Sequence, residues 1–365
     1  MHQASLRRRP VLASTRTAPD GAREWTMNDE PIRLRFWGTD RTIDLPNPIA
    51  GAEWVIGASS TNWLPLQDPT HFVSRRHAQL VHHEGRWRIE DLGSKNGTWE
   101  DGARRDIIAL TPGVEIGIGI YRLIAESPRT IELRALLARM IGYSPSRFGT
   151  IDRALRSLRE ASMLRTPLLL TGEGDLIAIA RRLHRAVVGT SMPFVVADPR
   201  RREHAKRHRG PVKYSSGVEA LEAAAGGMLC VWEKRPPGDF SEVLTRLVDP
   251  DCRVRLLICA RTTQSLGMAE IRIPSLSTRE IELDRVIKEY ASDAIDLLRA
   301  HPSSFTVDDH RWLVARQPRS LSEIERSTLR LVAIRECGGV SKGALRLGMN
   351  PSAMSRWRSR RPRRG

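Results

Sequence analysis

Hydrophobic residues are distributed in two different ways along the chain. Between residues 31 and 126, short β-like runs are separated by turns rich in glycine, asparagine and proline. Short strands at such regular spacing predict an all-β sandwich. The runs lie at 32–36, 54–56, 78–81, 87–89, 98–99 and 121–124.

After Ser127-Pro128 the pattern changes to continuous apolar runs that alternate with amphipathic segments. Apolar strands that alternate with helices predict a parallel sheet covered on both faces. From Arg279 onward the chain is predicted to be helical, and its last part, residues 320–365, to form a separate small module. The predicted strands lie at 167–170, 194–196, 228–231 and 254–259, and the helices between them at 176–187, 218–225 and 240–247.

The composition narrows the classes of protein. A chain of 365 residues with 40% hydrophobic residues builds two or three packed domains. No apolar run reaches 18 residues and none begins the chain, so we expect no membrane span and no secretory signal. The 4 cysteines form no C-x-x-C pair, so we expect no zinc site and a reducing, cytoplasmic location. Residues 1–27 lack periodicity and are predicted to be disordered, and Met27 is an alternative start.

The net charge of +17 is concentrated in three segments. Residues 1–27 carry five arginines and two acids, residues 199–213 seven basic residues and one glutamate, and residues 321–365 eleven basic residues and three glutamates. The rest of the chain is neutral overall. A neutral body with a basic C-terminal end indicates a dedicated polyanion-binding module, although a merely solubilising tail would give the same charge.

Three motifs stand in order within the β-rich segment: Ile56-Gly57, Ser74-Arg-Arg-His77 and Asp91-Leu-Gly-Ser-Lys-Asn-Gly-Thr98. Their order and spacing resemble a forkhead-associated (FHA) domain, assigned here to residues 28–128. The resemblance implies a β-sandwich whose loops at one end bind a phosphothreonine peptide, and it implies that His77 braces these loops.

The residue chemistry agrees with such a site. A phosphate requires converging donors, and Ser74 offers a hydroxyl while Arg75 offers a guanidinium. Asn96 and Gly97 allow a tight turn with positive φ, and the asparagine side chain suits a peptide backbone.

The sequence departs from the family at one position. Family members carry arginine directly after the first glycine, but this chain has Ala58, followed by Ser59, whose hydroxyl brings no charge. Loss of one charge-assisted contact costs about 1.5–3 kcal/mol. We therefore expect weakened phosphopeptide binding at Ser59, Ser74, Arg75, Asn96 and Gly97, or a sandwich retained for docking without phosphate.

The segment over residues 141–300 resembles the AAA+ ATPase domain of bacterial enhancer-binding activators, which work with the alternative sigma factor sigma-54. The resemblance rests on the ranges 168–174, 177–184, 192–196, 220–233 and 255–262. The nucleotide chemistry is missing, however. The phosphate loop is shortened to Gly172-Glu-Gly-Asp175, without the lysine and hydroxyl that bind phosphates and magnesium.

Further losses point the same way. Asp175 can cap the following helix and fill the anion site from within. Trp232 stands where the resemblance places a magnesium-binding aspartate, and the loop that touches the sigma factor is absent. We therefore expect no enzyme activity and no cofactor, and a degenerate core that serves as a scaffold. Nucleotide binding without hydrolysis, and an ATP-driven sigma-54 activator with unusual motifs, are the alternatives.

The C-terminal residues 320–365 predict three helices: 321–336, 342–347 with Ser341 as its cap, and a third that begins at Pro351 after the cap Asn350. The stretch from Cys337 to Trp357 resembles the Fis-type helix-turn-helix of enhancer-binding activators. The resemblance implies binding to DNA as a homodimer.

Residues of the third helix are the candidate DNA contacts. Met354 is expected in the core and Trp357 at its edge, and Arg356 is the best candidate for a bidentate contact with guanine. The exposed positions proposed for bases or phosphates are Ser352, Ala353, Ser355, Arg356, Arg358, Arg360 and Arg361.

Taken together, the sequence predicts a multidomain protein: an all-β FHA sandwich, a degenerate α/β AAA+-like core and an all-α helix-turn-helix. The predicted function is a cytoplasmic, phosphothreonine-responsive, DNA-binding transcriptional regulator whose partner is a Thr-phosphorylated protein or a Ser/Thr kinase. The alternative is a phosphopeptide-binding adaptor with a vestigial DNA-binding module.

Overall fold

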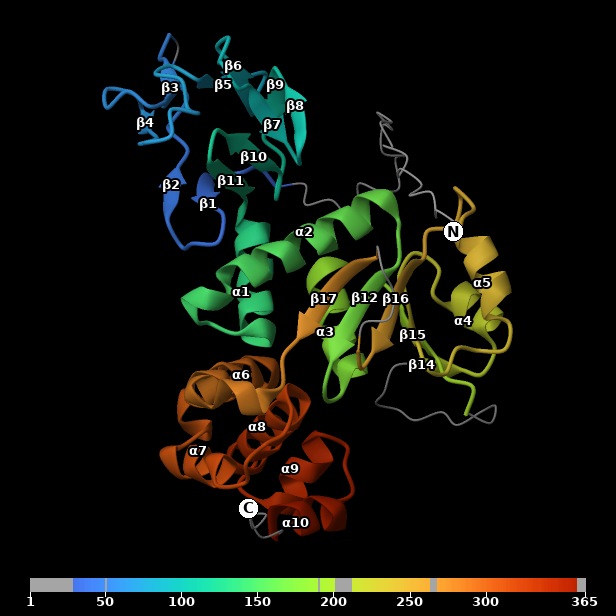
Figure 1. The fold of residues 1–365 in the computed structure, drawn as a ribbon. Coiled ribbons are helices and arrows are strands. Elements are labelled where there is room, and N and C mark those ends of the chain that lie inside the picture. Colours follow the sequence, from blue (N-terminus) through green and yellow to red (C-terminus); the bar gives the residue numbers. More distant parts are fainter. Residues whose placement is uncertain (1–28, 50, 190, 201–211, 263–267, 360–365) are drawn as a thin grey trace, which may run out of the picture.

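The structure, a computed structural model, describes residues 29–49, 51–189, 191–200, 212–262 and 268–359. Along the chain it has a β-sandwich, an α/β part and a helical part (Figure 1). The N-terminal segment predicted to be disordered and most of the basic stretch 199–213 lie outside the described residues.

The β-sandwich holds all six strands predicted from the sequence, together with several shorter ones. One sheet has the order β2-β1-β11-β10-β7-β8 and the other β4-β3-β5-β6-β9. Their inner faces bury a common core that includes Leu34, Ile56, Leu80, Ile89 and Leu123. The strands are β1 (Arg33–Phe36), β2 (Thr42–Asp44), β3 (Trp54–Gly57), β4 (Leu64–Pro65), β5 (Ala78–His83), β6 (Arg86–Asp91), β7 (Thr98–Glu100), β8 (Ala103–Arg105), β9 (Ile107–Ala109), β10 (Glu115–Ile118) and β11 (Tyr121–Glu126).

The α/β part contains the predicted parallel sheet, with the order β14-β13-β15-β16-β12-β17. All its neighbouring strands pair in parallel, and the central ones are buried along nearly their whole length. Its strands are β12 (Leu168–Gly172), β13 (Phe194–Ala197), β14 (Val212–Tyr214), β15 (Met228–Trp232), β16 (Arg255–Ala260) and β17 (Ala269–Ile273). Its helices are α2 (Phe148–Leu164), α3 (Leu176–Val187), α4 (Gly217–Ala223) and α5 (Phe240–Leu247), and α1 (Pro128–Ile141) leads in from the sandwich.

The helical part begins after β17. It consists of α6 (Leu283–Leu298), α7 (Val307–Val314), α8 (Leu321–Glu336), α9 (Val340–Arg346) and α10 (Pro351–Ser359). Short 3-10 helices precede α6 (Leu276–Glu282) and α7 (Pro302–Ser304), and another, Pro145–Arg147, precedes α2 in the α/β part. Helix α9 begins two residues before the predicted start, and Gly339 rather than Ser341 is its cap. The glycine pair Gly338-Gly339, both at positive φ, lets the chain turn directly from α8 into α9.

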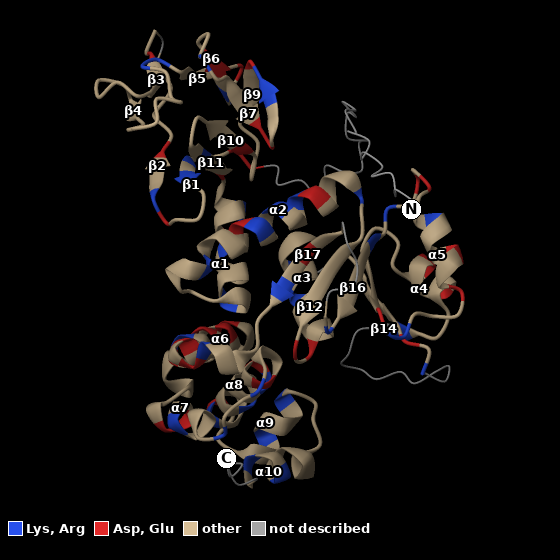
Figure 2. Ribbon diagram, viewed as in Figure 1, with Lys and Arg blue, Asp and Glu red and all other residues tan. Residues whose placement is uncertain are grey.

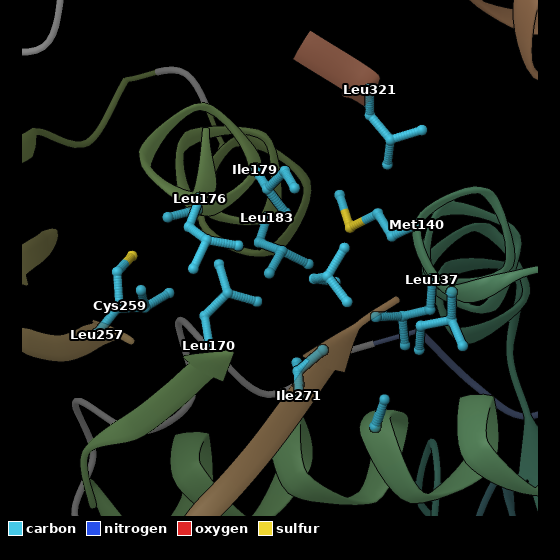
Figure 3. Packing of buried hydrophobic residues seen from close by; sticks show 14 of the residues in the cluster. Leu137, Met140, Leu170, Leu176, Ile179, Leu183, Leu257, Cys259, Ile271 and Leu321 are labelled. Atoms are coloured by element: carbon cyan, nitrogen blue, oxygen red, sulfur yellow. The ribbon is translucent and has the colours of Figure 1, made fainter. Parts of the chain in front are cut away.

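Helix α8 is not part of a separate C-terminal module, contrary to the sequence-based expectation. Leu321, Ile324 and Leu331 belong to the same buried cluster as the sheet residue Leu170. Figure 3 shows Leu321 at the edge of this cluster, near Ile179 of α3 and Met140 of α1. The helical pattern alone predicted α8 correctly, but it could not show which surface its apolar face covers.

The sandwich is joined to the α/β part by a buried ionic cluster. Arg35 is fully buried, its Nε lies 2.5 Å from Glu126 Oε1, and its guanidinium donates two hydrogen bonds to Asp152 of α2 at 2.8 and 3.0 Å. On the same face of α2, Arg156 pairs with Glu115 and Arg159 with Asp101. These contacts fix the sandwich on α2 by the outer face of one sheet, and β3–β6 lie on the side away from it (Figure 1).

Candidate functional site

The candidate site begins at Gly57, the last residue of β3. A Cβ atom at this position would lie 2.5 Å from the carbonyl oxygen of Arg75 and 2.8 Å from the amide nitrogen of His77. Only glycine therefore lets the turn 74–77 pack directly on β3. The amide of Ala58 then donates to the carbonyl of Ser74 at 2.9 Å. The residue after this glycine is thus fixed beside Ser74.

The backbone of Arg75 is held from the loop that follows β3. The amide of Ser59 donates to the Arg75 carbonyl at 3.1 Å, and Asn62 Nδ2 donates to the same oxygen at 2.7 Å. The Ser59 hydroxyl is engaged with the Thr61 hydroxyl at 2.9 Å. Ser59 therefore acts here mainly through its backbone. The Arg75 side chain is exposed and forms no ion pair with another described residue.

His77 connects the two loops that carry the predicted site residues. Its side chain is fully buried, its Nδ1 accepts from the amide of Ser74 at 3.1 Å, and its Nε2 lies 3.2 Å from the carbonyl oxygen of Gly97. These partners require the neutral tautomer with the proton on Nε2, which donates to Gly97. His77 is therefore a brace between the loops, as the sequence predicted.

The second loop is held by Asp91. Its carboxylate accepts from the amide and the hydroxyl of Ser94 at 2.7 and 2.6 Å, and the Ser94 hydroxyl oxygen accepts from the amide of Gly97 at 2.9 Å. Burial alone raises the pKa of Asp91, but the hydrogen bonds from Ser94 outweigh it, so the pKa of this carboxyl lies below its ordinary value. The loop is thus fixed by an ionised carboxylate.

The two loops meet at Ser74. Its hydroxyl oxygen accepts from the amide of Lys95 at 3.1 Å, which leaves the hydroxyl proton free to donate outward. Asn96 Nδ2 donates to the carbonyl of Phe72 at 2.9 Å, so its amide group holds the loop. The structure thereby brings the predicted residues Ser59, Ser74, Arg75, Asn96 and Gly97 together.

The sequence analysis missed three residues at this place. Asn62 was not distinguished from other turn residues. Lys95 lies inside the motif between Ser94 and Asn96, but no role for it follows from the resemblance. Arg104 of β8 lies with its guanidinium against Gly97, where any side chain would collide with it. Pairing of Arg104 with Trp99 across β7 and β8 places it there, and this pairing could not be deduced from the motifs alone.

The loop between β12 and α3 is the second place where the sequence resembles a phosphate-binding loop. Asp175 caps α3, and its carboxylate accepts from the amide of Ala178 at 3.3 Å. A Cβ atom at Gly172 would collide with the carbonyl oxygen of Ile273, and one at Gly174 would lie 3.0 Å from Ser320 Cβ at the start of α8. The helix N-terminus at this loop is therefore capped by its own carboxylate, and Ser320 lies close to Gly174, while Glu173 and Gly174 remain exposed.

Trp232 stands at the end of β15, where the resemblance to the AAA+ domain predicts a polar residue. Trp232 packs against the main buried cluster, and the amide of the next residue, Glu233, donates to the carbonyl of Cys259. Among the described residues there is no group of three or more His, Cys, Asp or Glu side chains that could hold a metal ion.

Helix α10 begins as predicted. Asn350 Oδ1 accepts from the amides of Ser352 and Ala353 at 2.8 and 3.4 Å. Met354 is fully buried, and the Trp357 ring lies 5.1 Å from the Trp312 ring of α7 in a T-shaped contact. Both residues therefore belong to the packing of the helical part.

The candidate DNA contacts divide between two sides of α10. Ser352, Ser355 and Arg356 are exposed together, and Ala353 is half-buried. Arg358 lies on the other side, over the Trp312 ring at 4.5 Å, with its Nη2 3.7 Å from Asp309 Oδ1. Arg360 and Arg361 lie outside the described residues. Figure 2 shows basic positions on both α9 and α10.

Comparisons with known proteins match the sandwich. The model of the FHA domain family matches residues 54–119. An oxoglutarate dehydrogenase inhibitor of Corynebacterium diphtheriae is 36% identical over 90 residues, which is 22% of this chain and 62% of that protein. The FHA domain-containing protein FhaB of Mycolicibacterium smegmatis is 38% identical over 80 residues, 22% of this chain and 46% of that protein. This chain thus spans less than two thirds of each relative.

A solved structure from a study of phosphothreonine-dependent FHA domain interactions is similar as well. It is 27% identical, with a TM-score of 0.23, and the match covers 26% of this chain and 94% of that one. The family model by itself identifies an FHA domain at residues 54–119. No helix within the described residues has the length and apolar character needed to cross a membrane.

Proposed function

We propose that this chain, through the FHA domain over residues 54–119, is a phosphothreonine-responsive regulator that binds DNA with its C-terminal helices. One observation carries the first half of the proposal. Ser74 and Arg75 present a hydroxyl and an unpaired guanidinium on a backbone fixed by His77, Ser59 and Asn62. Such converging, preorganised donors suit a phosphate.

The site is also accessible from outside. Within the described residues, the ion pairs from α2 to the sandwich go to Arg35, Glu115 and Asp101, none of which lies in the loops 57–62, 72–75 or 94–97. A Thr-phosphorylated protein or a Ser/Thr kinase can therefore reach the loops while the sandwich stays fixed on α2.

The DNA-binding half rests on α9 and α10. Lys342 and Arg346 of α9 are exposed, and so are Ser355 and Arg356 of α10. No acidic residue follows Glu336, so the face repels no phosphate backbone. This arrangement supports a helix-turn-helix of the Fis type, which we propose acts as a homodimer in the cytoplasm.

We propose further that the α/β part is a degenerate AAA+-like scaffold without enzyme activity or cofactor. The support is the β12–α3 loop, which lacks lysine, carries Asp175 as its own cap and lies close to Ile273 and Ser320 at its two glycines. Because the FHA domain and the DNA-binding helices belong to one chain, capture of a Thr-phosphorylated partner would change DNA occupancy by recruitment or by steric exclusion.

The alternative adaptor without DNA binding is separated by experiment. DNA affinity of the full chain should fall steeply with salt, and Arg356→Ala should weaken binding to the preferred site by about 1–3 kcal/mol. Arg86→Ala, which removes an exposed arginine from the sandwich, is the matched control and should leave DNA affinity unchanged. If removal of residues 349–365 leaves DNA affinity intact, the DNA-binding half of the proposal is wrong.

A further inference from the structure

The geometry points to Lys95 as the second cation of the phosphate site, in place of the arginine that Ala58 replaces. This inference rests on the proposed phosphothreonine binding. A phosphothreonine carries a charge of about −1.5 to −2 at neutral pH, so one guanidinium does not neutralise it. Position 58 supplies no charge, and the compensating group has to come from another residue near Ser74.

Lys95 and Ala58 flank Ser74 from two directions. The Ala58 amide donates to the Ser74 carbonyl at 2.9 Å, and the Lys95 amide donates to the Ser74 hydroxyl at 3.1 Å. The Lys95 backbone therefore lies directly beside the Ser74 hydroxyl that would contact the phosphate, and the Lys95 side chain starts from that point. Four methylene groups carry its ammonium over a distance of about 6 Å, enough to reach a phosphate bound at Ser74.

The position of Lys95 is fixed by its neighbours. Ser94 is held by Asp91, and Gly97 by both Ser94 and His77. The loop backbone thus needs no rearrangement to present the lysine, so the contact loses little free energy to ordering of the main chain.

The pattern of ion pairs around the site supports the same assignment. Arg76 pairs with Glu53 at 3.0 Å, Arg88 with Glu90 at 2.6 Å and Arg105 with Glu100 at 3.6 Å. By contrast, Lys95 and Arg75 form no ion pair with any other residue that the structure describes. Unneutralised cations remain where the two loops meet, which is the arrangement a dianionic ligand requires.

Arg104 is the competing candidate. Its guanidinium lies against Gly97, two residues beyond Lys95, and it too forms no ion pair within the described part of the chain. Unlike Lys95, it has no hydrogen-bonded connection to Ser74 in the described residues. It is therefore expected to face the peptide outside the phosphate itself.

The test uses the full chain and a degenerate phosphothreonine peptide library, with the unphosphorylated library as reference. Lys95→Gln should weaken phosphopeptide binding about five- to tenfold. Arg76→Gln removes the same charge from a residue paired with Glu53 and should leave the affinity unchanged. Adding Ala58→Arg to Lys95→Gln should restore the affinity, because the two positions serve the same phosphate.

The outcomes separate this inference from the proposed function. If the unaltered protein does not prefer phosphorylated peptides, the proposed function fails. If it does prefer them and Lys95→Gln binds as tightly as the unaltered protein, only the assignment of Lys95 is wrong. A loss with Arg104→Gln but not with Lys95→Gln would assign the second cation to Arg104 and overturn the inference in the same way.

Discussion

Two places in this protein have the general form of a phosphate site, and they differ in where their hydrogen-bond donors are directed. The first is formed by the FHA loops 57–62, 72–75 and 94–97 and is called the open loop here. The second is the β12–α3 loop, called the filled loop. In the FHA domain, the backbone is held by His77, Asp91 and Asn62, while the Ser74 hydroxyl proton and the Arg75 guanidinium are left for a ligand. In the β12–α3 loop, Asp175 caps the helix N-terminus itself, and Ser320 lies close to the exposed glycine beside it.

The difference shows that loop shape alone does not make an anion site. Both loops are glycine-containing and both follow a buried strand. An anion binds at amide and hydroxyl donors only if no internal carboxylate already satisfies them. The four predictions that follow change one loop or the other, in order of decreasing effect.

The largest effect is expected from Arg75→Ala. The arginine side chain is exposed and has no ion-pair partner within the described residues, so its removal should leave the fold intact. Phosphothreonine-peptide affinity should fall at least about a hundredfold, or about 2.7 kcal/mol. Calorimetry on the full chain measures this, with an unchanged thermal transition as the control. An unchanged dissociation constant would show that the open loop is not the ligand site.

Asp91→Asn should weaken the hydrogen bonds that hold the loop 94–97 without altering Ser74 or Arg75, the donors left for a ligand. Loss of the charge-assisted hydrogen bonds from Ser94 should destabilise the sandwich by about 2 kcal/mol. Because the folded pKa of Asp91 is depressed, this stabilisation is present above the unfolded pKa of about 3.9 and is lost as the pH falls through the folded value. Denaturant titrations between pH 2 and pH 6 on both proteins check this. Parallel pH profiles would contradict it.

Ala58→Arg should strengthen phosphopeptide binding at the open loop, whereas the two preceding variants weaken the site. The backbone at position 58 is fixed beside Ser74 and the Ala58 side chain is half-buried at the edge of the core, so we expect an added guanidinium to extend from there toward the bound phosphate. Binding should tighten by about tenfold, or 1.4 kcal/mol, when solvent screening is taken into account. Fluorescence anisotropy with phosphorylated and plain peptides measures the gain. An equal gain for both peptides would mean that the new charge acts nonspecifically.

Asp175→Ala tests the filled loop and is expected to have the smallest effect. Loss of the cap should lower the free energy of unfolding by about 1 kcal/mol, and Asp175→Ser should retain most of it. Neither variant should gain ATP binding, because no lysine stands in the loop to bind the phosphates and Glu173 keeps a negative charge there. Measurable binding of magnesium ATP to the alanine variant would show that the carboxylate alone had closed the site.

The sequence predicted the local parts of this fold better than their assembly. The motif residues from Gly57 to Thr98 identified the sandwich, because a glycine under a tight turn and a buried histidine brace leave a recognisable spacing. The Asp175 cap followed from the side-chain chemistry of a single residue. Each of these features depends on residues that are close together in the chain or in a fixed motif.

The assembly depends on contacts that the pattern does not contain. Leu321 and Leu170 share one buried cluster, and Arg35 is buried with Asp152, so both associations join residues more than a hundred positions apart. Arg358 was predicted to contact a DNA phosphate because it is a basic residue near the end of the last helix. In the structure its guanidinium lies over the Trp312 ring and near the Asp309 carboxylate. Lys95 was not predicted as a site residue because the resemblance assigns no role to the position between Ser94 and Asn96.

The most direct measurement is a pair of titrations on the unaltered full chain under one set of conditions. In one, calorimetry follows binding of a phosphothreonine peptide library and its unphosphorylated counterpart, and in the other, binding of magnesium ATP. The account predicts that heat of binding is seen with the phosphorylated peptides alone. Equal binding of both peptide libraries, or binding of ATP, would contradict the conclusion that one loop is open to phosphate and the other is filled by the protein.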